Sequence, residues 1–207
     1  MIDCRICKSK IDAFMTFGNM PIANGFLSQN EFAKEYFFEL RPAFCEVCGA
    51  FQLMDQPAPS QMFHDEYAFF SRTSLWMIEH FKDFSKWVRD QYLITPDPFV
   101  LEIGSNDGIL LENLAQAGIR HLGVEPSTNV AEDARSRGIN TISGFFDFQL
   151  AETLVEEYGQ AQAVLAANVM CHIPDLHGIA KGLDKLLAND GVFIFEDPYL
   201  GDMIEKT

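Results

Sequence analysis

The stretch FVLEIGSNDG, residues 99–108, joins an apolar strand pattern to a turn that contains two glycines. A helical pattern begins directly after it. Glycine lets the backbone approach a bound ligand closely, and the first N–H groups of a helix have no partner within that helix. This stretch therefore predicts a strand, a ligand-binding turn and the start of a helix.

Outward from this stretch, strand patterns alternate with helical patterns. The predicted strands cover residues 99–103, 121–125, 140–143, 163–168 and 191–197. The predicted helices between them cover 109–118, 129–138, 148–159 and 176–187. Such alternation implies right-handed βαβ units and a parallel sheet, an α/β fold. Apolar residues at helical spacing predict a further amphipathic helix over 75–89, before a turn at 95–98.

Composition limits the classes of partner. The chain has 207 residues, of which 48% are hydrophobic, so a packed core is expected. Its net charge of −15, with no run of Lys or Arg, disfavours a nucleic-acid partner. No window approaches 18 apolar residues, and the N-terminus lacks the pattern of a signal peptide. We therefore expect a cytoplasmic protein with no membrane partner.

Four cysteines form two pairs with the same spacing, Cys4-x-x-Cys7 and Cys45-x-x-Cys48. Two such pairs can complete a tetrahedral shell around Zn²⁺, and a full shell indicates a structural metal. The alternative is a redox pair, which needs a thioredoxin-like context that the first residues lack. Cys171 stands alone near the end of an apolar run and is more often a buried small hydrophobe than a nucleophile.

The turn itself discriminates between cofactors. A dinucleotide fingerprint needs glycines at 104, 106 and 109, but Asn106 and Ile109 occupy two of these positions. Nicotinamide cofactors are therefore disfavoured. The spacing instead fits E-x-G-x-x-x-G over residues 102–108, which resembles the first motif of class I methyltransferases, enzymes that use S-adenosylmethionine (SAM).

Two acids strengthen this interpretation. Glu125 ends the strand after the glycine turn, where an acid can accept hydrogen bonds from both ribose hydroxyls; the alternative is a solvated charge. Glu102 lies in an otherwise apolar strand, where a buried carboxyl group is costly unless it has a hydrogen-bond or charge partner. It would hold the amino-acid moiety of the cofactor, directly or through Asp107 and water. A buried hydrogen bond with no ligand is the alternative.

Three further positions follow predicted strands. Phe146, next to Asp147, lies where adenine would be bound, although ordinary core packing explains a phenylalanine equally well. Asn168 closes the fourth strand, and His172 follows in the next loop. Because ligands sit at the carboxyl ends of parallel strands, His172 is a candidate base or substrate contact. A surface histidine is the alternative.

Taken together, the motifs resemble the sugar C-methyltransferases of deoxysugar pathways, which act on nucleotide-linked sugars. The motifs that carry this resemblance are FCEVCG at 44–49, MFHDEY at 62–67, EIGSNDG at 102–108, HLGVEPS at 121–127, ANVMCHIP at 167–174 and FEDPYLGD at 195–202. The resemblance implies a zinc-binding domain over 1–60, a helical connector over 61–95 that contributes to the active site, and a SAM-binding domain over 96–207.

The resemblance also implies functional residues. Tyr67 matches the first tyrosine of the family's Y-x-Y element, whereas Phe69 replaces the second; Ser71 and Ser74 match the serines that follow. His172 matches an active-site histidine. The predicted set comprises catalytic His172 and Tyr67, cofactor-binding Tyr67, Ser71, Glu102, Gly104, Asn106, Asp107, Gly108, Glu125, Pro126, Phe146 and Asn168, and metal-binding Cys4, Cys7, Cys45 and Cys48.

The family continues beyond residue 207 into a segment taken to supply the general base, and then into a third domain. We therefore expect a truncated copy, a partner chain that supplies the missing part, or a fragment. The implied reaction is SAM-dependent C-methylation of a nucleotide-linked keto-deoxysugar. Three alternatives stay open: a weakly active or inactive SAM-binding scaffold, a methyltransferase with an oxygen or nitrogen acceptor, and a zinc-ribbon nucleic-acid binder, which the acidic charge disfavours.

Overall fold

The computed structural model describes residues 1–23 and 25–206. The last residue of the predicted segment 96–207, Thr207, lies outside the described part. The chain divides into two compact units, each described by itself below. The first contains residues 1–69 with 174–177, and the second contains 70–173 with the residues from Gly178 onward.

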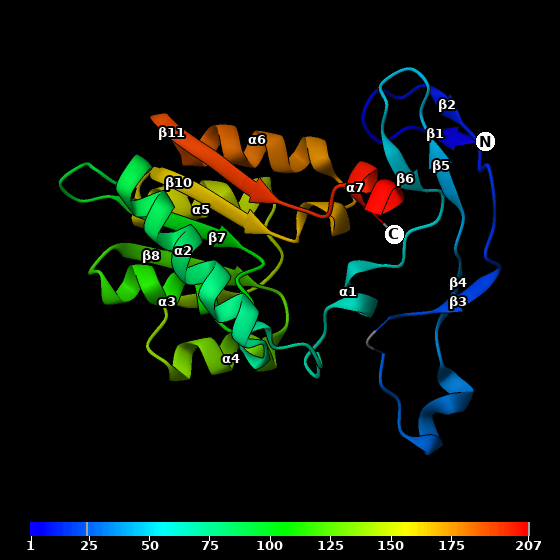
Figure 1. Ribbon diagram of the computed structural model, residues 1–207, viewed down its shortest axis with the longest axis horizontal. Helices are drawn as coiled ribbons and strands as arrows, with labels where there is room; N and C mark the ends of the chain where they lie inside the picture. Colours follow the sequence, from blue (N-terminus) through cyan, green and yellow to red (C-terminus); the bar gives the residue numbers. More distant parts are fainter. Residues whose placement is uncertain (24, 207) are drawn as a thin grey trace. The chain divides into compact units, whose positions relative to one another are not determined.

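A five-stranded parallel sheet forms the centre of the second unit (Figure 1). Its strand order is β11-β10-β7-β8-β9, and all four neighbouring pairs are parallel. The strands are β7 (Phe99–Ile103), β8 (Arg120–Glu125), β9 (Thr141–Ser143), β10 (Ala161–Ala167) and β11 (Leu187–Glu196). The predicted α/β fold with a parallel sheet is thus confirmed, although β11 begins earlier than its apolar pattern indicates.

Helices connect these strands. They are α3 (Ile109–Gln116), α4 (Thr128–Ser136), α5 (Phe148–Tyr158) and α6 (Leu176–Leu186), with α2 (Leu75–Tyr92) before the sheet and α7 (Leu200–Lys206) after it. The expected helix at 75–89 is present, three residues longer, while α7 was not predicted. None of the helices in the described residues combines the length and apolar character needed to cross a membrane.

Strand alternation divides the apolar residues of the sheet between two faces. On β7, Leu101 packs with the residues of α5 and α6, whereas Val100 packs with those of α2 and α3. Figure 1 shows α2 crossing one face of the sheet. Because Glu102 is two residues after Val100, alternation places this acid on the α2 and α3 side, where it is buried.

The strand β7 has β8 on one side and β10 on the other. The chain therefore changes direction across the sheet at this point, and in open α/β sheets ligands bind at the carboxyl ends of strands beside such a switch. Gly123 of β8 contributes to the close packing here, because a Cβ atom at this residue would lie 2.8 Å from the Cβ atom of Ser105. The turn after β7 consequently rests directly on β8.

Short antiparallel hairpins build the first unit. Strand β1 (Ile2–Asp3) pairs with β2 (Lys10–Ile11), β3 (Asn19–Pro21) with β4 (Phe37–Glu39), and β5 (Pro42–Phe44) with β6 (Phe51–Leu53). A 3₁₀ helix covers Gln29–Lys34, and α1 covers Pro59–Met62. The buried apolar cluster is small: Cys4, Ile11, Ala43, Cys45 and Met54. A core of this size usually needs a metal or a covalent link for stability.

The core of the second unit can be tested at Leu165, which is fully buried on β10. Leu165→Ala should lower the free energy of unfolding by about 2–5 kcal/mol, because it leaves a cavity. Both tryptophans, Trp76 and Trp87, lie on α2, so their fluorescence during urea unfolding reports on this unit. Ile94→Ala, at a residue that is 79% exposed, is the control and should change the value by less than about 0.5 kcal/mol.

Candidate functional site

The four paired cysteines converge in the first unit. The Sγ atoms of Cys4, Cys7, Cys45 and Cys48 all lie within 4.8 Å of one another. Two of the S–S separations are 3.7 Å, between Cys4 and Cys48, and 3.5 Å, between Cys7 and Cys45. Tetrahedral coordination with Zn–S bonds of about 2.3 Å requires sulfur atoms about 3.8 Å apart. The thiol set therefore fits a zinc ion with no position left for water.

Each pair of cysteines sits at the tip of a hairpin and repeats the same backbone pattern. Lys8 N–H donates to Cys4 C=O at 3.0 Å, and Gly49 N–H donates to Cys45 C=O at 2.8 Å. The residue after the second cysteine is left-handed in both turns, with φ of 63° at Lys8 and 76° at Gly49. Glycine adopts this conformation without strain, whereas lysine does so at some cost. This repeated backbone turn directs the two thiols of each pair toward the same point.

Polar neighbours favour the thiolate form at Cys4. Burial raises the pKa of this thiol, but hydrogen bonds from the amides of Cys7 and Ile6 and from Gln52 lower it to about 6. The amide nitrogen of the Gln52 side chain lies 3.2 Å from the sulfur. Thiolates are the form that binds zinc, and donors around them stabilise their charge.

The turn after β7 adopts three left-handed conformations in five residues. The φ angles are 67° at Gly104, 49° at Asn106 and 72° at Gly108. A Cβ atom at Gly104 would lie 2.5 Å from Val169, which follows β10. Gly104 is thus required twice, for its backbone angle and for the close approach of β7 to the loop after β10.

Glu125 accepts hydrogen bonds from the backbone at both carboxylate oxygens. Asn106 N–H donates to Oε2 at 2.9 Å, and Ser127 N–H donates to Oε1 at 2.8 Å. Burial raises the pKa of this acid, although the two amide bonds lower it in part. These bonds fix the carboxylate at the carboxyl end of β8, and each oxygen keeps a second lone pair for a ligand.

Glu102 and Asp107 are buried acids with oxygens that have no hydrogen-bond partner in the described part of the chain. At Glu102 this atom is Oε2, and at Asp107 it is Oδ1. Burial, together with the charges of Glu125 and Asp107, raises the pKa of Glu102 well above its ordinary range. Burial likewise raises the pKa of Asp107. A buried acceptor without a donor is costly, so these atoms indicate a ligand that donates.

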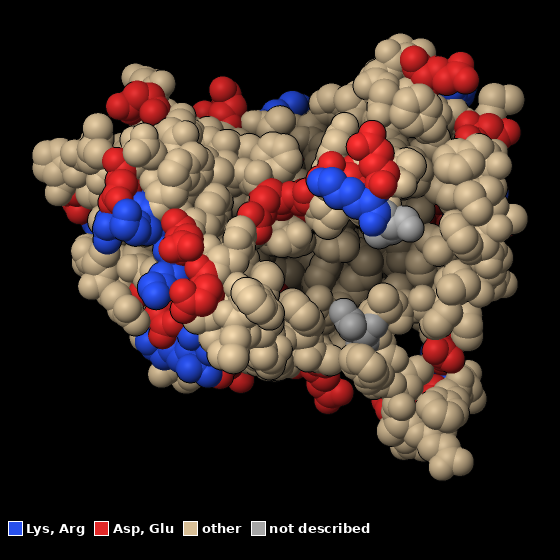
Figure 2. Space-filling model, in the orientation of Figure 1, with Lys and Arg blue, Asp and Glu red and all other residues tan. Residues whose placement is uncertain are grey.

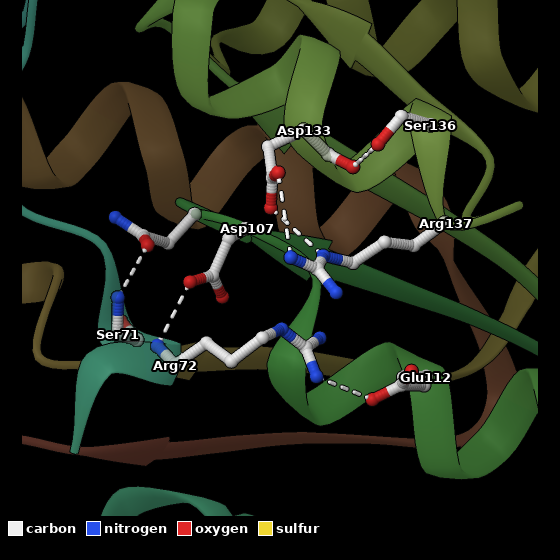
Figure 3. A network of polar contacts seen from close by, with 8 residues as sticks. Ser71, Arg72, Asp107, Glu112, Asp133, Ser136 and Arg137 are labelled. Atoms are coloured by element: carbon white, nitrogen blue, oxygen red, sulfur yellow. Dashed lines mark hydrogen bonds and ion pairs between the residues drawn. The ribbon is translucent and has the colours of Figure 1, made fainter.

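The segment before α2 closes one side of this turn (Figure 3). Ser71 N–H donates to the side-chain oxygen of Asn106 at 2.9 Å, and Arg72 N–H donates to Oδ2 of Asp107 at 2.8 Å. Ser71, predicted to bind the cofactor, thus contributes its backbone to the turn. The acids at this site favour a cationic ligand rich in donors over one that carries a pyrophosphate.

The other predicted positions are spread around the turn. Pro126 lies between Glu125 and Ser127, and Phe146 is buried in the core beside Gly182. Asn168, at the end of β10, is left-handed with φ of 58°, and its N–H donates to Glu196 C=O at 2.7 Å. A non-glycine residue in this conformation frequently marks a functional site.

The two predicted catalytic residues lie in different units. Tyr67 belongs to the first unit, where its ring centroid lies 5.6 Å from that of Phe63. His172, in the second unit, ends the 3₁₀ turn Met170–His172 after β10. The residue His172 is exposed, as expected for a surface histidine. Partial desolvation of its ring nevertheless lowers the pKa of His172, while Asp197 raises it in part. A neutral imidazole at physiological pH can accept a proton.

Cys171 corrects one expectation, because it is exposed where a buried residue was predicted. Its loop lies on the surface, and the apolar run ends before it. Partial burial of the sulfur and the neighbouring carboxylate of Asp197 raise the pKa of this thiol to about 12. Such a thiol stays protonated and is a poor nucleophile.

Sequence reasoning missed two polar contacts of the second unit. Arg72 Nη1 lies 2.7 Å from Glu112 Oε2, and His80 Nε2 lies 2.9 and 3.0 Å from the two carboxylate oxygens of Glu196. The partners are 40 and 116 residues apart in sequence. Neither separation matches a helix or strand period, so no local sequence pattern predicts these contacts.

Charged side chains elsewhere form small mixed groups. Figure 2 shows Lys and Arg next to Asp and Glu on the visible face, without a continuous basic band. The ion pairs of α2 are of this kind: Lys86 and Arg89 both contact Asp90. Exposed pairs such as these contribute little to stability and mark no binding surface.

The fold and the site together define a methyltransferase with a zinc module. Residues 78–205 match the family described as "Methyltransferase domain", and residues 4–63 match the family described as "Putative zinc binding domain". The chain belongs to the methyltransferase domain family, with a zinc-binding domain before it, and has the SAM-binding methyltransferase fold.

Relatives and solved structures agree with this assignment. The chain is 32% identical over 208 residues, 99% of its length, to the C-methyltransferase NovU of Streptomyces niveus. It is 32% identical over 106 residues to a ubiquinone biosynthesis O-methyltransferase of Actinobacillus pleuropneumoniae serotype 5b, covering 46% of the chain. It spans about half the length of these relatives, 49% and 44%.

Two solved structures share the fold. The PH0226 protein of Pyrococcus horikoshii OT3 has a TM-score of 0.53 at 19% identity and covers 67% of this chain and 62% of its own. The plantazolicin methyltransferase BpumL, solved with a pentazolic desmethylPZN analogue and S-adenosylhomocysteine (SAH), has a TM-score of 0.51 at 15% identity. This match covers 65% of the present chain and 52% of BpumL. At these identities the likeness shows the fold alone.

The thiol centre predicts one zinc ion per chain. Cys45→Ser should remove the ion and lower the melting temperature, because the buried shell loses one ligand. Elemental analysis after gel filtration measures the zinc content. Cys171→Ser, which changes the only other cysteine of the sequence, is the matched control and should retain a full equivalent. Equal zinc content in both variants would contradict a four-cysteine site.

Proposed function

We propose that the chain binds SAM at the turn 104–108 and takes part in methyl transfer to a carbon atom of a nucleotide-linked keto-deoxysugar. The observation that carries the first part is the set of buried acids beside the strand switch, two of which have oxygens with no hydrogen-bond partner among residues 1–23 and 25–206. The similarity to NovU over nearly the whole chain supports a carbon acceptor.

The chemistry of SAM matches these acids. Its ribose carries two hydroxyl donors, its amino-acid moiety carries an ammonium group, and its sulfonium is a cation. Glu125 would accept from the ribose hydroxyls, while Glu102 and Asp107 would face the ammonium group. Gly104 and Gly108 would let the backbone approach the cofactor, and Asn168 would line the neighbouring strand end. Burial of these acids without a partner lowers the stability of the fold, and a ligand that pairs with them would offset this cost.

When bound, SAM supplies a methyl group activated by the adjacent sulfonium. The contribution of the chain is to orient both reactants, to exclude water and to accept a proton from the carbon that is methylated. His172 is the candidate acceptor of that proton, at an imidazole nitrogen, because its lowered pKa keeps it neutral. A positioned general base typically contributes about 10²–10⁴-fold to the rate.

One specific observation favours a second candidate function. The similarity to an O-methyltransferase covers 106 residues of the chain and permits an oxygen acceptor. An oxygen acceptor needs no carbon acid, so loss of His172 would matter less for it. We infer the carbon acceptor because the match to NovU covers 99% of the chain, against 46% for the other relative.

We propose a zinc-binding domain over 1–60, a connector over 61–95 and a methyltransferase domain over 96–207. The helix α2 of the connector packs against α3, and the 3₁₀ turn Ser71–Thr73 before α2 contacts the glycine turn through the backbone of Ser71 and Arg72. These contacts support a contribution of the connector to the cofactor site. Cytoplasmic location, and a partner chain that completes the acceptor site, belong to the same proposal.

Glu125 gives the most direct test of the cofactor site. Glu125→Gln should weaken SAM binding about 10- to 100-fold, because one charged acceptor of the ribose hydroxyls is lost. Isothermal titration calorimetry measures the affinity. Glu156→Gln, on the exposed side of α5, removes the same charge elsewhere and should bind as the wild type does. Equal losses in both variants would indicate a general charge effect and contradict the site.

The acceptor is tested by adding a nucleotide keto-sugar together with SAM. We expect a methylated sugar with a new carbon–carbon bond, detected by mass spectrometry and NMR. His172→Gln should lower the rate at least about 10²-fold while SAM affinity stays within about twofold. Methylation at oxygen would favour the second candidate function. Binding of SAM without any transfer would indicate a scaffold and contradict the proposed activity.

The protonation of Glu102 should affect both the free energy of unfolding and the binding of SAM. A raised pKa means that the folded state favours the protonated acid, so the stability associated with Glu102 is lost as pH rises through the folded-state pKa. Glu102→Gln is neutral at every pH and should raise the free energy of unfolding at pH 8 by about 1–3 kcal/mol. The gain should vanish below pH 4.5, the ordinary value, where both states are protonated.

The same variant should bind SAM more weakly, because glutamine cannot carry the charge that pairs with the ammonium group. Urea unfolding followed by tryptophan fluorescence measures the first effect, and calorimetry measures the second. A variant that is less stable at pH 8 would contradict the raised pKa of Glu102. A variant that binds SAM at least as tightly as the wild type would show that the charge of Glu102 does not pair with the ligand.

A further inference from the structure

The short 3₁₀ turn Ser71–Thr73 is joined to the turn 104–108 by two backbone donors. The N–H groups of Ser71 and Arg72 point to the side chains of Asn106 and Asp107, at 2.9 and 2.8 Å (Figure 3). Side chains of the glycine turn are thus held by the backbone of a segment about 35 residues earlier in the chain. The orientation of both side chains depends on where that segment lies.

The side chain of Arg72 fixes this segment from the other side. Its Nη1 atom donates to Oε2 of Glu112 at 2.7 Å. Glu112 lies in the first turn of α3, which follows the glycine turn directly. The two side chains are only 20% and 30% exposed, so this pair is better shielded from solvent than the pairs on the surface of α2. Arg72 therefore contacts the glycine turn with its backbone and the following helix with its side chain.

The contacts continue to the acid predicted to bind ribose. Asn106 accepts from Ser71 through its side chain and donates its own N–H to Glu125 at 2.9 Å. Asn106 also adopts a left-handed conformation, with φ of 49°. A non-glycine residue in this region costs about 1 kcal/mol or more and needs surrounding contacts to persist. The contact from Ser71 is one of them.

Charges around Arg72 explain why this guanidinium is held in place. Asp107 and Glu112 are close to it, and the Asp133–Arg137 pair of α4 lies beside them in the same view (Figure 3). Two further nitrogens of Arg72, Nε and Nη2, are buried without a hydrogen-bond partner among the described residues.

We propose that Arg72 is a positioning residue for the cofactor site: through Glu112 it holds the 71–73 turn against the 104–108 turn, and thereby orients Asn106 and Asp107 toward the ligand. This inference rests on the proposed binding of SAM at that turn. In this role Arg72 contacts the 104–108 turn through its backbone N–H and contacts Glu112 of α3 through its side chain.

The experiment compares Arg72→Met, Arg72→Lys and Glu112→Gln with the wild type. The product SAH is the probe, and calorimetry gives its affinity. Arg72→Met should weaken binding about tenfold, whereas Arg72→Lys, which keeps the charge near Glu112, should recover part of that loss. Arg89→Met is the matched control, because the ion pair of Arg89 among the described residues is with the adjacent Asp90 on α2. The affinity of this variant for SAH should stay within about twofold of the wild-type value.

Hydrogen exchange provides a readout that a loss of general stability would not produce. In Arg72→Met without ligand, the amides of Ser71 and Arg72 should exchange at least about tenfold faster, while those of β10 keep the wild-type rate. Glu112→Gln should change the same two amides in the same direction. It serves as the test if Arg72→Met does not fold.

Wild-type affinity in Arg72→Met, or unchanged exchange at Ser71 and Arg72, would overturn the inference. If instead the wild-type chain fails to bind SAH, the proposed function is contradicted, and the exchange comparison still decides whether Arg72 holds the turn. The two failures are therefore distinguishable.

Discussion

Burial of carboxylates at the ends of two adjacent strands is the constraint on which the second unit depends. Glu102 and Glu125 lie on β7 and β8, and the turn that follows β7 adds Asp107. Backbone amides donate to both oxygens of Glu125 and to one oxygen of Asp107, while one oxygen of Glu102 has no donor among the described residues. Such an arrangement costs stability in the empty protein, and a cationic ligand with hydrogen-bond donors offsets that cost.

In the first unit, local backbone turns place the four cysteines close together. Two hairpins present the same backbone turn, so that each pair of sulfurs faces one point without help from a large core. The unit has few buried apolar residues, and a zinc ion would supply the cross-link that its size demands. In both units, therefore, tight turns with left-handed residues place charged groups where burial alone would exclude them.

Much of this could be predicted from the sequence. Short apolar runs that alternate with helical patterns predicted the strands and helices of the sheet. Glycine spacing with two acids predicts a cofactor site at the turn 104–108, and this site stays a prediction. The contacts of Arg72 with Glu112 and of His80 with Glu196 could not be predicted, because their partners are distant in the chain and follow no period. Two-residue strands such as Ile2–Asp3 are too short to show alternation. The exposure of Cys171 depends on a loop path that composition does not encode.

A crystal structure of the chain with bound SAH would show whether the buried acids bind the cofactor. Both ribose hydroxyls should lie within hydrogen-bonding distance of the Glu125 carboxylate. The ammonium group should lie near Glu102 and Asp107, and the backbone of the turn 104–108 should be unchanged. A ligand bound elsewhere, or at this turn with its ribose directed away from Glu125, would contradict the proposed cofactor site.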